Sequence, residues 1–240
     1  MSEVSAQWVL LMALSTLLEQ RDSNSESHII RMQHYVQDLA FALRQHPKFA
    51  ATLTPRYMEH LVRFTPLYDL GTAGIPDRVL IKPAVLNPEE LSLMRTHTLL
   101  GHAAIEQAQK TLGIDNADPA LLLVKEMILS HHEKWNGMGY PYGLVGDAIP
   151  VSARLVALAD AYDSIISSKV YKEGLPHREA VKTIFSERGE HFDPDIVDAF
   201  MEIHTSFETI AQHYADTPAD MQFKIDYMAK AIAENADTLP

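Results

Sequence analysis

The chain has 240 residues, with 20 lysines and arginines against 32 aspartates and glutamates, so its net charge at pH 7 is −12 with histidine neutral. This charge argues against a general surface for nucleic-acid polymers or anionic membranes, although a local cationic pocket for a phosphate ligand stays open. The absence of cysteine excludes disulfides and thiolate metal sites, whereas twelve histidines leave imidazole and carboxylate sites available.

The first predicted element is a helix over residues 4–20, which contains the apolar run 8–18. The run is short and follows no basic region, so it is interpreted as a helix packing face rather than as a signal peptide. No stretch reaches the ~18 uninterrupted apolar residues of a membrane span. We expect no membrane partner, and a cytoplasmic location as the default.

Apolar residues recur at three- and four-residue spacing along nearly the whole chain, which predicts helices. After 4–20 these cover residues 28–45, 54–67, 88–112, 119–131, 152–167, 176–186 and 194–214, with a last helix within 217–240. Prolines in first turns follow plausible N-caps at Thr54, Asn87, Asp118 and Asp193. Because no alternating polar and apolar run is long enough for a strand, we expect an all-α bundle.

Two predicted loops, 71–87 and 133–150, are longer than a helical bundle needs. Long loops rich in turn residues are more often functional than idle in a compact helical domain.

The second loop follows the adjacent pair His131 and His132. Neighbouring helical side chains diverge by roughly 100°, so both rings can meet one site only where the helix ends. Gly137 and Gly139 allow that ending, since glycine tolerates positive φ. A solvated histidine pair at the negative end of a helix dipole remains the alternative.

Four further residues are candidate ligands: His28, Asp69, His97 and Asp160. The first three have simple alternatives, namely a surface histidine, a turn cap and a core histidine. Asp160 favours a function, because it follows the apolar stretch 155–159 and a buried carboxylate is costly unless it is paired or metal-bound.

Together, four imidazoles and two carboxylates on separate helices suit a pair of divalent ions such as Fe, Mn, Ni or Zn. Such a pair would activate water for in-line attack on phosphorus. Lys169 and Lys172 could hold phosphate oxygens, and Tyr140 could stack on a base or donate to a phosphate. Solvated lysines and a packing tyrosine are the alternatives.

These residues stand in stretches that resemble the HD-GYP family, the cyclic di-GMP phosphodiesterase branch of the HD superfamily of metal-dependent phosphohydrolases. The resemblance covers about residues 21–201. The matching stretches are Arg21-Asp22 with His28, Gly74-Ile75-Pro76-Asp77, Met94-Arg95-Thr96-His97-Thr98, His131-His132-Glu133-Lys134-Trp135-Asn136-Gly137, Gly139-Tyr140-Pro141, Ala157-Leu158-Ala159-Asp160-Ala161-Tyr162-Asp163 and His191-Phe192-Asp193-Pro194.

The resemblance implies an HD-type helical bundle with a metal centre between helices. It places His28, Asp69, His97, His131, His132 and Asp160 on metal-ligand positions. Asp69, Lys169 and Lys172 fall on catalytic positions. Tyr140 and the same two lysines fall on substrate-binding positions, with Lys169 in place of the more usual arginine.

Three positions depart from the family pattern. Tyr68-Asp69 replaces the His-Asp pair, Thr72 replaces a lysine, and Asn24 replaces an acidic ligand. Phenol is a poor ligand unless it is deprotonated, and its reference pKa is about 10. We expect one complete ion site, a weaker second site at His28, Asp69 and Asp160, and no third ion.

The predicted function is impaired, metal-dependent hydrolysis of cyclic di-GMP in bacterial second-messenger signalling. The alternative is an inactive cyclic di-GMP-binding or protein-interaction module, and hydrolysis of another nucleotide is less favoured because the Gly139-Tyr140-Pro141 loop is intact. The predicted organisation is a coupling or dimerisation helix at 1–20, an HD-GYP domain at 21–205 and a helical extension at 206–240. A receiver or sensor domain upstream and a second copy of the chain are candidate partners.

Overall fold

The computed structural model describes residues 3–21, 26–82, 84–114, 117–168 and 173–236. In these segments the protein is built from helices and contains no β-strand, which confirms the predicted all-α fold. The elements are α1 (Glu3–Arg21), α2 (Glu26–Leu43), α3 (Pro55–Phe64), η1 (Thr65–Leu67), η2 (Leu70–Gly74), α4 (Asp77–Leu80), α5 (Pro88–Arg95), α6 (His97–Leu112), α7 (Pro119–Ser130), η3 (Gly146–Ala148), α8 (Val151–Ile166), α9 (His177–Ser186), α10 (Pro194–His213) and α11 (Pro218–Ala236).

The predicted N-caps are confirmed. Thr54 accepts a hydrogen bond from the amide of Tyr57, and Asp118 and Asp193 likewise accept from amides of their own first turns. Asn87 forms a reciprocal capping box with Glu90. Each cap satisfies amides that a helix N-terminus leaves unpaired, and the following proline has no amide hydrogen to lose.

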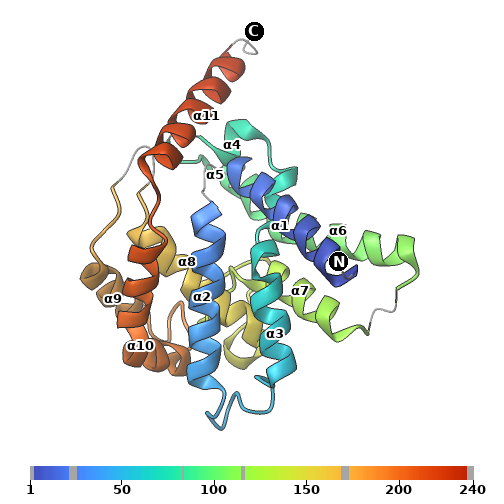
Figure 1. Ribbon diagram of the computed structural model, residues 1–240, viewed down its shortest axis with the longest axis vertical. Coiled ribbons are helices and arrows are strands. Elements are labelled where there is room, and N and C mark those ends of the chain that lie inside the picture. The colour runs from blue at the N-terminus through green and yellow to red at the C-terminus, as the bar shows by residue number, and fades with distance from the viewer. Residues whose placement is uncertain (1–2, 22–25, 83, 115–116, 169–172, 237–240) are drawn as a thin grey trace.

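Helix α2 lies at the centre of the bundle and packs against α3, α8 and α10 (Figure 1). Aromatic rings fill the space between them. The Tyr35 ring stacks on Phe207 at 4.4 Å and meets Tyr162 edge-on at 5.3 Å between centroids. This apolar core packs α2 against α8, the two helices that carry His28 and Asp160.

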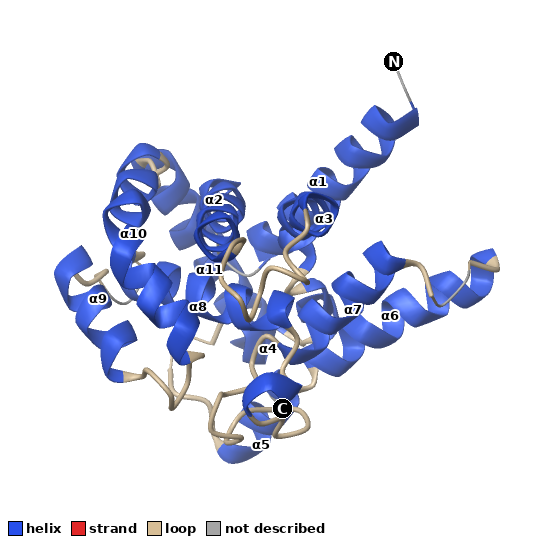
Figure 2. Ribbon diagram, turned by 90° about the horizontal axis from the view of Figure 1, so that it is seen from below, coloured by secondary structure: helices blue, strands red, loops and turns tan. Residues whose placement is uncertain are grey.

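Helices α6 and α7 run side by side next to this bundle, as Figure 2 shows. The short η2 helix lies directly on α6. A Cβ atom at Gly71 would come within 1.8 Å of the carbonyl oxygen of His97, so only glycine allows this approach. The contact brings the turn that carries Asp69 against the start of α6.

The prediction of one helix over 88–112 is wrong, because the helix breaks at Thr96 into α5 and α6. The Thr96 hydroxyl donates to the carbonyl of Leu93 at 2.7 Å, a local bond that competes with the helical pattern. As a result, His97 is the first residue of α6. The sequence also gave no indication of α4, which lies within the predicted loop 71–87.

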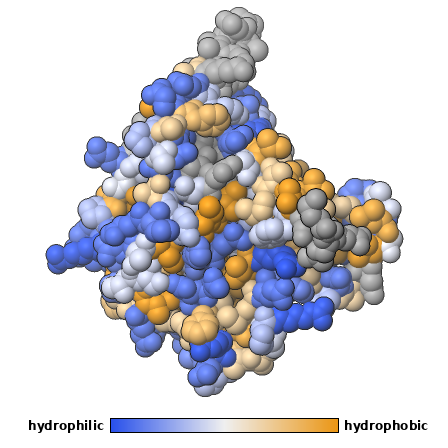
Figure 3. All heavy atoms as spheres, in the orientation of Figure 1, coloured by the Kyte–Doolittle hydropathy of each residue, from blue (hydrophilic) through white to orange (hydrophobic). Residues whose placement is uncertain are grey.

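Within the described part of the chain, no helix is long and apolar enough to cross a membrane. Several apolar residues of α1 are nevertheless exposed, among them Val9, Leu10, Leu14 and Leu17. On the face seen in Figure 3, hydrophobic residues form small separate groups among hydrophilic ones.

Candidate metal centre

Four potential metal ligands converge from three segments of the chain: Asp69, His97, His131 and His132. One ligand atom from each lies within 4.8 Å of the others. Asp69 stands in the turn between η1 and η2, His97 begins α6, and the histidine pair follows the last residue of α7.

The helix-end geometry explains why both members of the histidine pair reach this point. Helix α7 ends at Ser130, and the rings of His131 and His132 lie 4.2 Å apart between centroids. Because the helix has ended, the two side chains can point to the same site, whereas adjacent side chains within a helix point in different directions.

Backbone carbonyls fix the orientation of two of the rings. Nδ1 of His97 lies 2.8 Å from the carbonyl oxygen of Met94, and Nδ1 of His131 lies 3.0 Å from that of Ile128. A carbonyl can only accept, so each Nδ1 carries a hydrogen, and the neutral ring presents the lone pair of Nε2 to the site.

Three acceptor atoms therefore face one another. Asp69 Oδ1 lies 3.2 Å from His97 Nε2 and 3.3 Å from His131 Nε2, and the two nitrogens are 3.4 Å apart. Oδ1 is buried and, among the described residues, makes no hydrogen bond of normal geometry. Such a cluster needs positive charge at its centre, and one carboxylate with three imidazoles is a donor set that fits a divalent cation.

The electrostatics agree with this requirement. Burial favours protonation of Asp69, but the adjacent His131 and His97 rings outweigh it and hold the pKa of the carboxyl well below its usual range. The positive charge beside the Asp69 carboxylate would come either from protons on the two rings or from a bound cation. The pKa of His132 is lowered by burial and by His131, which keeps the ring neutral and able to bind a metal. About a quarter of the Asp69 side chain stays exposed, so an ion can enter from solvent.

The remaining two candidates, His28 and Asp160, lie next to this cluster and are joined by Tyr68. The Tyr68 hydroxyl donates to Asp160 Oδ1 at 2.9 Å, and its oxygen lies 3.0 Å from Nε2 of His28. The Tyr68 ring meets His131 edge-on at 5.2 Å. Burial and the charge of Asp69 raise the pKa of Asp160. These two residues therefore do not fit a second cation as they stand, because a phenol occupies the space between them.

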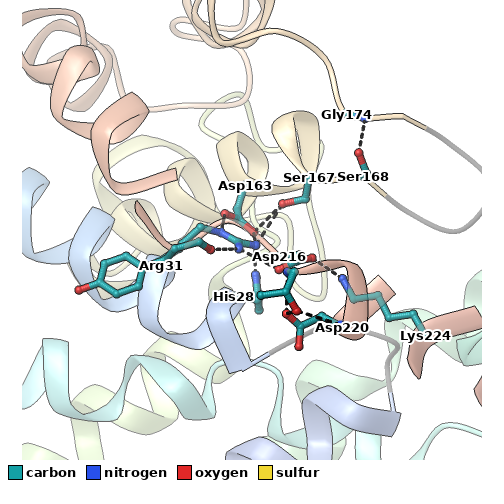
Figure 4. A network of polar contacts seen from close by, with 11 residues as sticks. His28, Arg31, Asp163, Ser167, Ser168, Gly174, Asp216, Asp220 and Lys224 are labelled. Atoms are coloured by element: carbon teal, nitrogen blue, oxygen red, sulfur yellow. Dashed lines mark hydrogen bonds and ion pairs between the residues drawn. The ribbon is translucent and has the colours of Figure 1, made fainter. Parts of the chain in front are cut away.

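Sequence reasoning missed Arg31 and Asp163, which orient His28. Both oxygens of Asp163 accept from Arg31, at 2.6 Å and 2.8 Å, and its Oδ2 also accepts from His28 Nδ1 at 2.8 Å. Figure 4 shows His28 and Arg31 directed from α2 toward Asp163 on α8. Arg31 lies three residues after His28, and Asp163 three after Asp160, so helical spacing was the available signal.

Tyr140 borders the cluster from the loop 133–150. Its ring stacks on the His132 ring at 4.8 Å between centroids, and the Arg95 guanidinium lies over the Tyr140 ring at 5.1 Å from its centroid. The buried Glu133 shapes the loop by accepting the amides of Tyr142 and Leu144. Burial, with the charge of Asp69, raises the pKa of Tyr140 above its ordinary value, so its hydroxyl remains a hydrogen-bond donor at neutral pH. Arg95 was not singled out from the sequence, although it lies two residues before His97.

A cleft of about 410 Å³ opens beside the cluster. Its lining includes His131, His132, Lys134, Asp160 and His191. Lys169 and Lys172, the predicted phosphate contacts, and Asn24 lie outside the described residues.

Comparison with known proteins adds three findings. Residues 13–196 match the family model for the HD domain. The chain is 45% identical over 215 residues to a probable cyclic di-GMP phosphodiesterase of Vibrio cholerae, covering 90% of this chain and 48% of that protein. It is 32% identical over 210 residues to the cyclic di-GMP phosphodiesterase response regulator RpfG of Xanthomonas campestris, covering 87% of this chain and 51% of the relative. The chain thus spans about half the length of these relatives.

The fold has a solved counterpart in a cyclic GMP-AMP specific phosphodiesterase of Vibrio cholerae. The TM-score is 0.57 at 16% identity, and the match covers 95% of this chain and 59% of that one. At this identity the likeness concerns the fold alone.

Proposed function

The chain belongs to the HD domain family and to its HD-GYP branch, and on that premise we propose that it is a metal-dependent phosphodiesterase that opens cyclic di-GMP at a reduced rate. The observation that carries the proposal is the meeting of Asp69 Oδ1 with the Nε2 atoms of His97 and His131 within 3.4 Å of one another. A cation between these three atoms would explain why their lone pairs face one another. The relatives named above support the choice of substrate.

Asp69, His97, His131 and His132 would hold the cation. A divalent ion such as Fe, Mn, Ni or Zn supplies a positive charge that polarises a phosphodiester oxygen and eases deprotonation of water. The Nδ1 bonds to Met94 and Ile128 keep two of the imidazoles aimed inward before any ion arrives.

Tyr140 and Arg95 would bind the nucleotide. The Tyr140 ring offers a face for a base or a hydroxyl for a phosphate, and the exposed Arg95 adds a positive charge beside it. The cleft next to His132 would take the rest of the substrate. Lys169 and Lys172 are proposed to contact phosphate, as the family motif implies. Attack by water on phosphorus then breaks one ester bond and yields a linear dinucleotide.

The proposed reduction in rate rests on three positions. Tyr68 stands where the family has its histidine, Thr72 where it has a lysine, and Asn24 where it has an acid. The Thr72 hydroxyl donates to the carbonyl of Asp69 at 2.9 Å, so it supports the backbone but offers no charge to a phosphate. Loss of a ligand or its support commonly costs a factor of about 10–100.

A second candidate function is a non-catalytic cyclic di-GMP receptor. The observation in its favour is the Tyr68 hydroxyl between His28 and Asp160, which engages two of the six proposed ligands. The metal cluster and Tyr140 would then bind the ligand without opening it.

Turnover of cyclic di-GMP by the Mn²⁺- or Fe²⁺-loaded chain, followed by chromatography of the linear product, separates the two. We expect slow formation of product, abolished in a His131→Ala, His132→Ala variant. Simultaneous Tyr68→His, Asn24→Glu and Thr72→Lys substitutions should raise the rate at least tenfold. Binding without product under every metal would establish the receptor function instead. Because 3′3′-cGAMP is named for another Vibrio cholerae relative, it should be assayed in parallel.

We also propose that α1 couples the site to an upstream receiver or sensor domain, or to a second copy of the chain. Arg21, its last residue, donates to the carbonyls of Thr72 and Ala73 at 2.8 Å and pairs with Asp77. These contacts connect α1 to the backbone that follows Asp69.

A further inference from the structure

We propose that this chain holds one divalent cation per molecule, bound by Asp69, His97, His131 and His132. The Tyr68 hydroxyl occupies the place of a second cation between His28 and Asp160. The inference rests on the metal dependence of the proposed function but not on turnover, since it concerns the number of ions bound.

Both donors of the second position are already engaged. The Tyr68 hydroxyl oxygen is 3.0 Å from His28 Nε2 and 2.9 Å from Asp160 Oδ1. Nδ1 of His28 is bound to Asp163 at 2.8 Å, which leaves Nε2 as the nitrogen that faces the site. Whichever atom carries the hydrogen, the contact with Tyr68 occupies the nitrogen that would otherwise meet a cation.

Tyr68 cannot readily turn away. Its side chain is 3% exposed and belongs to the main apolar core, and its ring meets His131 edge-on. Its amide donates to the carbonyl of Thr65 at 3.0 Å, which fixes the backbone immediately before Asp69. Displacing the phenol would therefore disturb a ligand of the first cation as well.

Replacement of the phenol would leave room for a second cation. A cavity of about 80 Å³ is lined by His28, Tyr68, Asp69 and Asp160, among others. An ion would fit its volume once a ligand replaced the phenol. The inference therefore predicts that Tyr68→His opens the second position.

The test is the manganese content of the chain, measured by elemental analysis after loading with Mn²⁺ and desalting. We expect one Mn²⁺ per chain in the natural sequence and in Tyr68→Phe, and two in Tyr68→His. Two ions per chain in the natural sequence would overturn the inference. So would a phenolate-to-iron charge-transfer band in the Fe³⁺-loaded protein that Tyr68→Phe abolishes, because Tyr68 would then be a ligand.

A second set of variants keeps the test decisive if Tyr68→His fails to fold. His28→Ala and Asp160→Asn should retain one Mn²⁺, whereas His97→Ala and His131→Ala should lose it, with folding verified by thermal unfolding. Equal loss of metal in both pairs would refute the inference. One ion per chain without turnover contradicts the proposed function alone, and two ions with turnover contradicts this inference alone.

Discussion

Replacing Asp163 with asparagine should destabilise the protein strongly. The Asp163 carboxylate is 2% exposed and accepts hydrogen bonds from Arg31, His28 and Ser167. Asparagine keeps the volume but removes the charge. The buried Arg31 guanidinium is then left with Asp216 at 3.2 Å as its ion-pair partner, and with hydrogen bonds to the Tyr214 carbonyl and the Ser167 hydroxyl. Breaking one partner of a buried ion pair costs about 3–5 kcal/mol.

Urea unfolding followed by circular dichroism measures this loss. With a denaturant slope of about 3 kcal/mol per molar, the midpoint should fall by roughly 1–1.7 M. The control is Asp198→Asn, which breaks an ion pair with Arg188 of similar length, 2.7 Å, whose side chains are 54% and 40% exposed. The control should leave the midpoint unchanged within error, because water screens that pair. Equal effects of the two substitutions would refute the argument that burial decides the strength of the Asp163 pair.

Three further predictions concern the site and its surroundings. Gly71→Ala should weaken Mn²⁺ binding about 10–100-fold in a metal titration, because the new methyl group forces η2 away from His97. The control is Gly74→Ala, which should leave Mn²⁺ binding unchanged because its Cβ would meet the flexible side chain of Leu100. Burial, with a smaller effect of the Lys134 charge, lowers the pKa of His191 to about 4. Between pH 6.5 and 4, His191 is therefore protonated in the unfolded chain but neutral in the folded chain. The free energy of unfolding should therefore fall by about 1–2 kcal/mol as the pH is lowered from 6.5 to 4, with the partial exposure of the ring taken into account. An equally steep fall in His191→Gln would contradict the assignment of this loss to His191. Tyr140→Ala should weaken cyclic di-GMP binding in calorimetry about 10–100-fold and Tyr140→Phe much less, if the ring face is what binds; equal losses would point to the hydroxyl instead.

Local rules predicted much of the fold. Proline preceded by a capping residue marked the starts of α3, α5, α7 and α10, and the glycine turn after the histidine pair indicated the end of α7. These features depend on neighbours within about four residues, which a single sequence displays. The break at Thr96 escaped prediction because apolar spacing continues through it.

The candidate site was predicted in its residues but not in its connections. The six proposed ligands do come together, and which of them bind metal remains a prediction. Tyr68 reaches Asp160 across 92 residues, and Arg31 reaches Asp163 across 132. Such pairings depend on how helices pack, and the sequence gives only the residue types. The replacement of histidine by Tyr68 was visible as a departure, whereas its role as a bridge required coordinates.

Anomalous X-ray diffraction from crystals grown with Mn²⁺ tests the metal centre most directly. The account predicts one strong peak per chain, between Asp69 Oδ1 and the Nε2 atoms of His97 and His131. A peak between His28 and Asp160, or none at either position in saturated crystals, would contradict it.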